Sequence, residues 1–336
     1  MTDHIFNITN ELYPIQNGII NLTKNVSVGN TLNIYKIDNN GNYIKSGKLK
    51  LKKQLGSPGG EGIVYDTTIN GMVCKIFHDN KLVKFRIQKL ISMIRHKVNI
   101  NGVCWPNALL YNSKLEIVGY LMPKANGYTV KEGLILPSRN RIFPNYKRKE
   151  LILVSISILK MVRQLHERNV IIGDINDCNI LVKDYNEIYI IDCDSFQIDG
   201  YPCPVSQEAF IRKHLQNKDL SKILRTKEDD IFAISTLIFM ILFLGQKPYT
   251  IRNGGSTAEN IAKGIFPYSS KNRNLNLIPM GCYEDIWNKF PRKLKDVFDS
   301  CFSYGNILPI DELINALENY IKNIELGKIS NELKNM

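Results

Sequence analysis

The sequence lacks the features that mark secreted, membrane-spanning and zinc-binding proteins. Its seven cysteines form no C-x-x-C pair, which argues against a zinc site or a disulfide framework and favours a reducing compartment. The opening residues, MTDHIFNITNELYP, contain no basic stretch followed by an apolar core, so we expect no signal peptide. The most apolar run, 231–244, is shorter than the roughly 20 residues that span a bilayer, and it predicts a buried helix. We therefore expect a cytoplasmic protein without a membrane segment.

Blocks of like charge are also missing, although the chain is basic. The formal net charge is +12, from 44 Lys and Arg against 32 Asp and Glu. The excess is scattered rather than gathered in runs of about five or more, which indicates a solvated basic surface. Such a surface favours polyanionic ligands, nucleotides and acidic protein segments among them. No nucleic-acid-binding motif accompanies the charge, so we expect no nucleic-acid partner.

Length and pattern indicate an α+β chain with two lobes. The 336 residues correspond to about two folding units, or one large bilobal unit, at roughly 150 residues per domain. The first third contains strand-like segments and turn signals at Asn17-Gly18 and Asn40-Gly41. It also contains a helix over 79–96, for which Asp79 is the expected N-cap.

The remainder is mostly helical. We expect helices at 151–169, 229–245, 284–303 and 310–325. Two short strands, 179–182 and 187–192, interrupt them and are joined by a polar turn. A β-rich segment followed by a helical segment is typical of an α+β fold.

A glycine cluster between two expected strands is the first candidate phosphate-binding segment. It reads LGSPGGEGIVY over 55–65, and glycines allow a backbone to approach phosphates closely. Such clusters are more often simply turns. The G-x-x-x-x-G-K-[ST] loop of P-loop ATPases is absent. Lys75 follows in the apolar segment VCKIF, either facing outward or aimed at nucleotide phosphates, because burying an unpaired ammonium group is costly.

The most informative pattern is an Asp, an Asn and further Asp residues spaced along 170–196. Asp174 precedes Asn179 by five positions, two short strands follow, and Asp192 and Asp194 come next. These residues resemble the catalytic loop and DFG region of protein kinases. D-C-D-S-F resembles a bacterial branch of the eukaryotic-like (Hanks-type) kinase superfamily that carries D-x-D-S-F in place of DFG. A purely structural interpretation, in which these polar residues only cap turns, stands beside it.

The resemblance covers about residues 50–325 and implies a bilobal protein-kinase-like fold, with a β-rich N-lobe and a mostly helical C-lobe. It implies an N-terminal extension at 1–50 with extra strands, an N-lobe at 51–124 and a C-lobe at 125–336. ATP and Mg²⁺ are the implied cofactors. Phosphoryl transfer requires a carboxylate near the acceptor hydroxyl, and a carboxylate with an amide oxygen to hold magnesium.

The resemblance also assigns a role to each matching residue. Asp174 is the implied catalytic base, and Lys75 the catalytic lysine that holds the α- and β-phosphates. Asn179 and Asp192 are the implied metal ligands, with Asp194 competing for the role of Asp192. The implied nucleotide-binding residues, from the glycine loop, the strand lysine and the hinge, are Gly56, Gly59, Gly60, Gly62, Val64, Lys75, Met122 and Lys124.

Several family features are absent. Gly173 stands where the Arg of HRD is expected, so regulation by activation-loop phosphate is doubtful. Asn176 replaces the catalytic-loop Lys, and Glu61 stands where an aromatic residue is common. The expected helix over 79–96 contains no Glu to pair with Lys75, and Gln88 is its nearest polar substitute.

Two features of the C-lobe bear on the same comparison. Asp230 resembles the buried Asp that steadies the catalytic-loop backbone in the family. The A-P-E region carries Arg212-Lys213-His214, and Leu308 replaces the Arg that usually pairs with its Glu.

The first interpretation is a protein kinase that phosphorylates Ser or Thr of a protein substrate. A small-molecule kinase similar to aminoglycoside and choline kinases is the alternative within catalysis. A pseudokinase that binds nucleotide and partners without turnover is a third. The sequence leaves open the acceptor, the mode of regulation, the oligomeric state and the role of residues 1–50.

Overall fold

The computed structural model describes residues 26–38, 40–78, 81–135, 138–271 and 274–332. The chain forms two compact units. Unit 1 comprises Met1–Lys97 and Trp105–Lys124, and unit 2 comprises Val98–Cys104 and Ala125–Met336. The turn expected at Asn17-Gly18 and the N-cap expected at Asp79 lie outside the described residues. The domain boundaries expected at 50 and 124 stay predictions.

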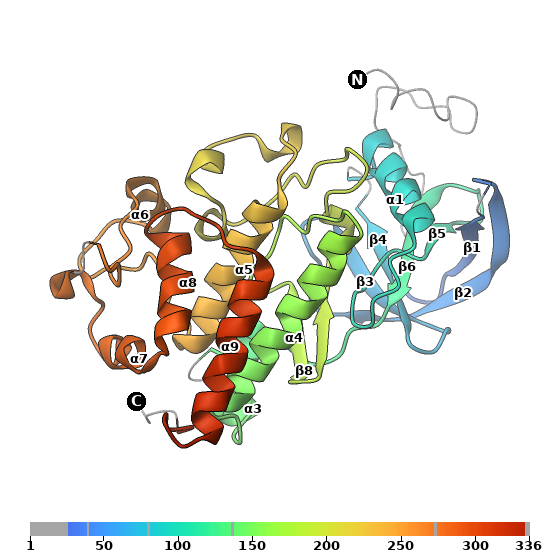
Figure 1. Ribbon diagram of the computed structural model, residues 1–336. Helices are drawn as coiled ribbons and strands as arrows, with labels where there is room; N and C mark the ends of the chain where they lie inside the picture. The colour runs from blue at the N-terminus through green and yellow to red at the C-terminus, as the bar shows by residue number, and fades with distance from the viewer. Residues whose placement is uncertain (1–25, 39, 79–80, 136–137, 272–273, 333–336) are drawn as a thin grey trace. The chain divides into compact units, whose positions relative to one another are not determined.

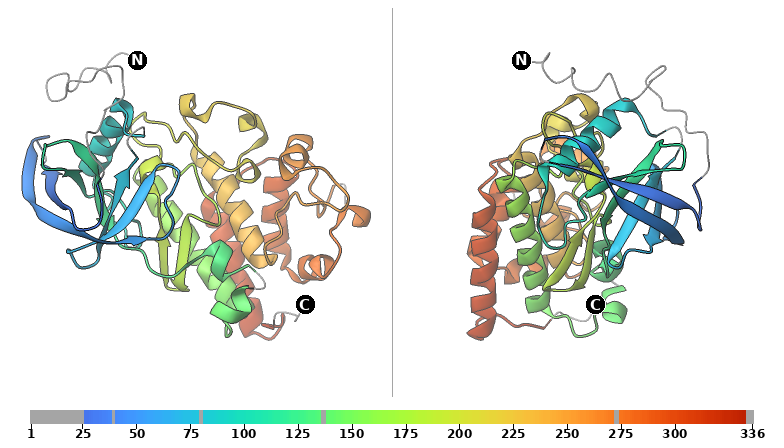
Figure 2. Two further views of the ribbon diagram at one scale, coloured as in Figure 1. Left: turned by 180° about the vertical axis from the view of Figure 1, so that it is seen from behind. Right: turned by 90° about the vertical axis from the view of Figure 1, so that its right-hand side faces the viewer.

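Unit 1 contains an antiparallel β-barrel, visible as blue to green strands in Figure 2. Its strands follow the order β1-β2-β3-β4-β6-β5, and β1 pairs with β5 to close the barrel. In β2, Leu49 and Leu51 face inward whereas the lysines between and beside them face solvent, as the two-residue period of a strand requires. The strands are β1 (Thr31–Ile37), β2 (Tyr43–Leu55), β3 (Gly62–Thr67), β4 (Met72–Phe77), β5 (Ala108–Tyr111) and β6 (Ile117–Pro123).

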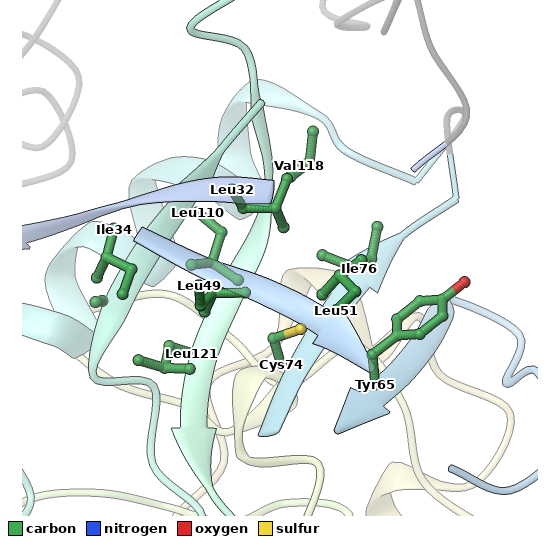
Figure 3. Close-up of a cluster of buried hydrophobic side chains, with 11 residues drawn as sticks. Leu32, Ile34, Leu49, Leu51, Tyr65, Cys74, Ile76, Leu110, Val118 and Leu121 are labelled. Atoms are coloured by element: carbon green, nitrogen blue, oxygen red, sulfur yellow. The ribbon is translucent and has the colours of Figure 1, made fainter. Parts of the chain in front are cut away.

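The inward-facing side chains converge in one apolar core, shown in Figure 3. Each such aliphatic side chain contributes about 1.5–3 kcal/mol when it leaves water. Closure leaves the barrel without a free strand edge, which protects it from pairing with other chains. The core residues are Leu32, Ile34, Leu49, Leu51, Tyr65, Cys74, Ile76, Ala108, Leu110, Val118 and Leu121.

One helix, α1 (Lys84–His96), accompanies the barrel, and it begins later than position 79. Val83, in an extended conformation, is its N-cap. The helix buries Ile87, Leu90, Met93 and Ile94, which recur at helical spacing. The Trp105 indole N–H donates to the Met93 carbonyl at 2.8 Å and fixes the end of the helix to the chain that follows.

Unit 2 is mostly helical, which together with the antiparallel barrel of unit 1 confirms the expected α+β, bilobal kinase-like fold. The long helices α4, α5 and α9 lie side by side in Figure 1, and α4 contacts both of the others. The helices are α2 (Val130–Gly133), α3 (Ser138–Ile142), α4 (Arg148–Glu167), α5 (Lys227–Leu242), α6 (Thr257–Lys263), α7 (Tyr283–Lys289), α8 (Arg292–Phe302) and α9 (Ile310–Glu325).

The single helix expected over 284–303 is two helices. Helix α7 ends at Lys289 and α8 begins at Arg292, with Pro291 as its N-cap. Proline has no amide hydrogen and disfavours helical conformation in the residue before it, so the chain turns at Phe290-Pro291. The sequence contained this signal, and the prediction of one helix was wrong.

Helix α5 is the expected buried helix, since its residues from Phe232 to Leu242 are all buried. Within the described residues, no helix combines the length and apolar character needed to cross a bilayer. Aromatic side chains from α5, α7, α8 and the intervening loops pack against one another around this helix. They are Phe232, Phe239, Phe243, Tyr249, Phe266, Tyr268, Trp287, Phe290, Phe298 and Phe302.

A small antiparallel sheet carries the expected hairpin. Its strands are β7 (Tyr128–Thr129), β8 (Ile180–Asp184) and β9 (Glu187–Ile190), in the order β7-β8-β9. Ile180 lies opposite Ile190 in the register. The start of β8 therefore meets the end of β9, where the site predicted from the sequence is found.

Candidate active site

The loop between α4 and β8 is held by a buried carboxylate from α5. Asp230, with 1% of its surface exposed, accepts hydrogen bonds from the backbone amides of Ile172 at 2.7 Å and Gly173 at 2.8 Å. Asp230 also contacts His166 Nε2 on α4, at 3.0 Å. Hydrogen bonds to an ionised carboxylate are stronger than neutral ones. The expected role of Asp230 in steadying this loop is confirmed.

Asp174 lies at the centre of the loop, and two amide side chains hold its carboxylate. Asn176 Nδ2 donates to Oδ1 at 3.1 Å, and Asn179 Nδ2 donates to Oδ2 at 3.0 Å. Burial raises the pKa of Asp174 above its ordinary value, while these two amides and Arg225 pull the pKa down and Asp192 adds to the rise. The carboxylate is thus oriented by donors and made more basic by burial.

Asn179 and Asp192 lie at the same end of the β8–β9 hairpin. The Ile191 amide donates to the Asn179 carbonyl at 3.0 Å, which places Asp192 one residue beyond that bond. Asp192 has a left-handed backbone, with φ of 55°, a conformation that is uncommon in residues other than glycine. The structure therefore brings Asp174, Asn179 and Asp192 together, and Asp192 acts electrostatically on both Asp174 and Cys104.

Asp192 and Asp194 have different surroundings. Asp192 is partly exposed, whereas Asp194 is 5% exposed and lies in a short 3-10 helix over Cys193–Ser195. The Ser195 hydroxyl donates to the Asp192 carbonyl at 3.0 Å and closes this turn. Among the described residues, no three or more His, Cys, Asp or Glu side chains form a group that could hold a metal ion. A magnesium site here would combine a carboxylate with the Asn179 amide oxygen.

A residue that the sequence interpretation missed, Arg225, reaches this loop from the segment before α5. Its side chain, 4% exposed, donates to the carbonyl of Gly173, and to those of Cys203 at 2.6 Å and Val205 at 2.7 Å. Gln197 holds its backbone through bonds of 2.7 and 2.8 Å. Arg225 thus ties the catalytic-type loop to the segment after Asp194.

A second missed residue, Glu61, lies in the glycine loop of unit 1. Its Oε2 is 3.6 Å from the ammonium nitrogen of Lys75, which is 7% exposed. Arg86, on α1, donates to both oxygens of Glu61 at 2.6 Å. Because a buried ammonium group requires a counter-charge, Glu61 supplies what the helix lacks. A single acidic residue within the glycine segment, followed by a lysine in the next strand, was the available signal.

The glycine loop is a turn between β2 and β3, bridged by a hydrogen bond from the Gly59 amide to the Gly62 carbonyl at 3.0 Å. A Cβ on Gly62 would lie 2.3 Å from the Ile76 carbonyl oxygen, so only glycine fits there. Gly56, Gly59 and Gly60 are exposed. In the barrel, Val64 lies opposite Lys75.

The expected hinge residues lie at the end of β6. Met122 is buried and pairs with Val73 of β4. The Lys124 amide donates to the Gly71 carbonyl at 2.9 Å, and its ammonium group is 3.4 Å from Asp66. Because this amide hydrogen is already bonded to Gly71, adenine would have to contact a different atom of Lys124.

A β-barrel unit with a strand lysine, and a helical unit with Asp174, Asn179 and Asp192 on a loop and hairpin, are consistent with a protein-kinase-like fold. The sequence is 30% identical over 241 residues to the protein named protein kinase YegI of Escherichia coli O157:H7, and 29% identical over 252 residues to its namesake in strain K12. This homology supports placing the chain in the kinase-like superfamily.

The similarity extends over part of each protein. It covers 68% and 70% of this chain, but 37% and 39% of the two relatives. The chain thus spans well under half the length of the curated relatives that it matches. No protein-family model matches the sequence.

Proposed function

We propose that the protein is an ATP- and Mg²⁺-dependent protein kinase that transfers the γ-phosphate to a Ser or Thr hydroxyl of a protein substrate. One observation carries the proposal. The Asn179 side chain orients the Asp174 carboxylate, and the Asn179 carbonyl accepts a hydrogen bond from the amide of Ile191, the residue before Asp192. Phosphoryl transfer depends mainly on positioning and charge neutralisation. The names of the two relatives support the same activity.

Asp174 is the proposed catalytic base. A base must accept a proton near neutral pH, and efficiency is greatest when its pKa approaches the working pH. Burial raises the pKa of Asp174 in that direction. The two Asn amides fix the carboxylate so that one oxygen can accept the proton of the acceptor hydroxyl as the new P–O bond forms.

Asn179 and Asp192 are the proposed metal ligands. The Asn179 amide nitrogen donates to Asp174, which leaves its side-chain oxygen for a cation. Mg²⁺ prefers oxygen ligands and, when bound, neutralises phosphate charge. Asp192 is the more accessible of the two neighbouring carboxylates, and we assign it the direct role and Asp194 the structural one.

In unit 1, Lys75 is the proposed partner of the α- and β-phosphates, and the glycine loop their backbone cradle. Glu61 holds the Lys75 ammonium group, and the bidentate contact with Arg86 fixes Glu61 in turn. An Arg–carboxylate pair of this kind is geometrically specific. Glu61 thereby connects the glycine loop and α1 to Lys75.

The function is tested by incubating the purified chain with γ-labelled ATP and Mg²⁺ and analysing phosphoamino acids in the chain and in added lysate proteins. Labelled serine or threonine is the expected result. Label confined to small metabolites would instead identify a small-molecule kinase. Nucleotide binding without any transfer would identify a pseudokinase.

A further inference from the structure

A cavity in unit 2 lies outside the site described above. Its volume is about 680 Å³, within the range of roughly 300–1,000 Å³ typical of ligand sites. We call the part lined by the segment 212–218 its wall, and the part lined by residues of α5, α6, α8 and the loops near them its floor. The lining residues used in the argument are Arg212, Lys213, His214, Lys218, Phe232 and Tyr304.

The charged groups lining the cavity are all cationic or, for His214, able to become so. No acidic side chain is among its lining residues. Arg212 and His214 share one carboxylate, Asp229, at 3.4 Å each. Lys213 and Lys218 are exposed, and neither has a carboxylate partner within the part of the chain that the structure describes. The cavity thus carries uncompensated positive charge.

The remaining lining combines four aromatic side chains and two isoleucines with the polar Gln216 and Ser303. Phe232, Tyr249 and Phe302 are buried, Ile261 is buried beside them, and Tyr304 is 57% exposed at the rim. Burial raises the pKa of Cys301, also in the lining, to about 12, so this thiol adds no negative charge. A ligand that carries both anionic and apolar side chains complements such a wall and floor.

The position of the cavity in the chain favours a peptide. Its cationic wall, 212–218, follows a few residues after the segment 203–205, whose carbonyls Arg225 ties to the loop of Asp174. The residues that would hold an occupant are therefore part of the same segment that follows the catalytic-type cluster. An occupant held here would contact the same stretch of chain that leads away from Asp192 and Asp194.

We propose that this cavity is a docking site for an acidic segment of the protein substrate, in which carboxylate or phosphate groups meet Arg212, Lys213 and Lys218 while apolar side chains meet the aromatic floor. The identity of the occupant as substrate rests on the proposed kinase function. Binding of the acidic segment requires neither ATP nor phosphate transfer. An experiment can therefore reject the docking site and the kinase function separately.

Fluorescence anisotropy of the full chain with a labelled peptide of alternating Glu and Leu tests the proposal. Lys213→Glu combined with Lys218→Glu should weaken binding at least about tenfold, because two favourable contacts become repulsive. Lys50→Glu is the control: Lys50 is exposed on β2, and a charge reversal there should leave binding unchanged. Tyr304→Ala should weaken binding at high salt, where charge contacts are screened.

Four results would overturn the docking site, and three of them concern peptide binding. They are the absence of binding, an equal loss in Lys50→Glu, and equal binding of a matched peptide with Gln in place of Glu. Inhibition by free glutamate or inorganic phosphate as strong as that by the peptide would also overturn it, in favour of a small-anion site. Peptide binding that persists in Asp174→Asn, which should lack transfer, would support docking independently of catalysis.

Discussion

The side chain of Cys203 and the guanidinium group of Arg225 together border the space in which a side chain at position 173 would lie. A Cβ on Gly173 would be 3.1 Å from Arg225 Cζ and 2.6 Å from the Cβ of Cys203. Gly173 stands where the kinase resemblance places an arginine, so a buried arginine from a distant segment occupies the neighbourhood of the missing one. The two residues are 52 positions apart, and three carbonyls from two segments share the one guanidinium group.

This relationship predicts that Gly173 cannot be replaced. Gly173→Ala should lower the free energy of unfolding by about 2–3 kcal/mol, because left-handed backbone strain is added to a clash with Cys203. Gly264→Ala is the matched control: Gly264 has φ of 68°, close to the 74° of Gly173, with no atom within 4 Å of its added Cβ. It should lose only about 1 kcal/mol. Equal losses by urea unfolding would show that the space beside Gly173 is not restricted.

Arg225 should influence both the rate and the pH dependence of transfer. Its charge lowers the pKa of Asp174, so Arg225→Met should raise that pKa and move the acidic limb of the kcat profile to higher pH. The loss of three donors should also reduce kcat by about tenfold to a hundredfold through misplacement of the loop. Arg225→Lys keeps the charge and loses the planar fork, so it should lose rate with a smaller shift of the limb. An unchanged limb in Arg225→Met would reject the electrostatic role.

Glu61 should affect the KM for ATP through its contact with Lys75. Glu61→Gln removes the counter-charge of a nearly buried ammonium group, and we expect the KM for ATP to rise about tenfold. Steady-state kinetics at varied ATP measure this effect. Glu116→Gln is the control, since Glu116 lies beyond the barrel core and accepts a hydrogen bond from Asn112. A KM that stays constant in Glu61→Gln would leave the pair without a functional role.

The two neighbouring carboxylates should separate by their effects on metal and on stability. Asp192→Asn should raise the Mg²⁺ concentration needed for half-maximal rate by about tenfold, because the residue that we propose as the direct ligand loses its charge. Asp194→Asn should mainly lower the melting temperature, since Asp194 is 5% exposed and its replacement disturbs a buried polar group. Asp199→Asn, at an exposed position nearby, should do neither. The reverse order in Mg²⁺ titrations would exchange the two assignments.

The features that the sequence predicted well are local. Asp174, Asn179 and Asp192 are close in sequence, and one loop and one hairpin suffice to place them together. The barrel strands and the buried helix α5 could be predicted from the spacing of their apolar residues, because burial and intrinsic propensity favour the same structures. The helix α9 begins and ends where the pattern predicted, Ile310 to Glu325.

The features that the sequence did not predict depend on long-range packing. Glu61 meets Lys75 only because β3 and β4 pair in a particular register. Arg225 meets Gly173 only because α5 and the chain before it fold back onto the loop. The cationic cavity combines segments from 212 to 307. Local propensity contains no information on such contacts, since they are decided by how the elements assemble.

Asp174 is the residue on which the account depends most, and single-turnover transfer from γ-labelled ATP measures its role directly. Asp174→Asn removes the base but keeps a side chain of the same shape between Asn176 and Asn179. We expect phosphate transfer to fall by at least about a hundredfold, with ATP binding measured by calorimetry nearly unchanged. Transfer at the rate of the unaltered chain, in a variant that folds and binds ATP, would contradict the assignment of this loop as a catalytic centre.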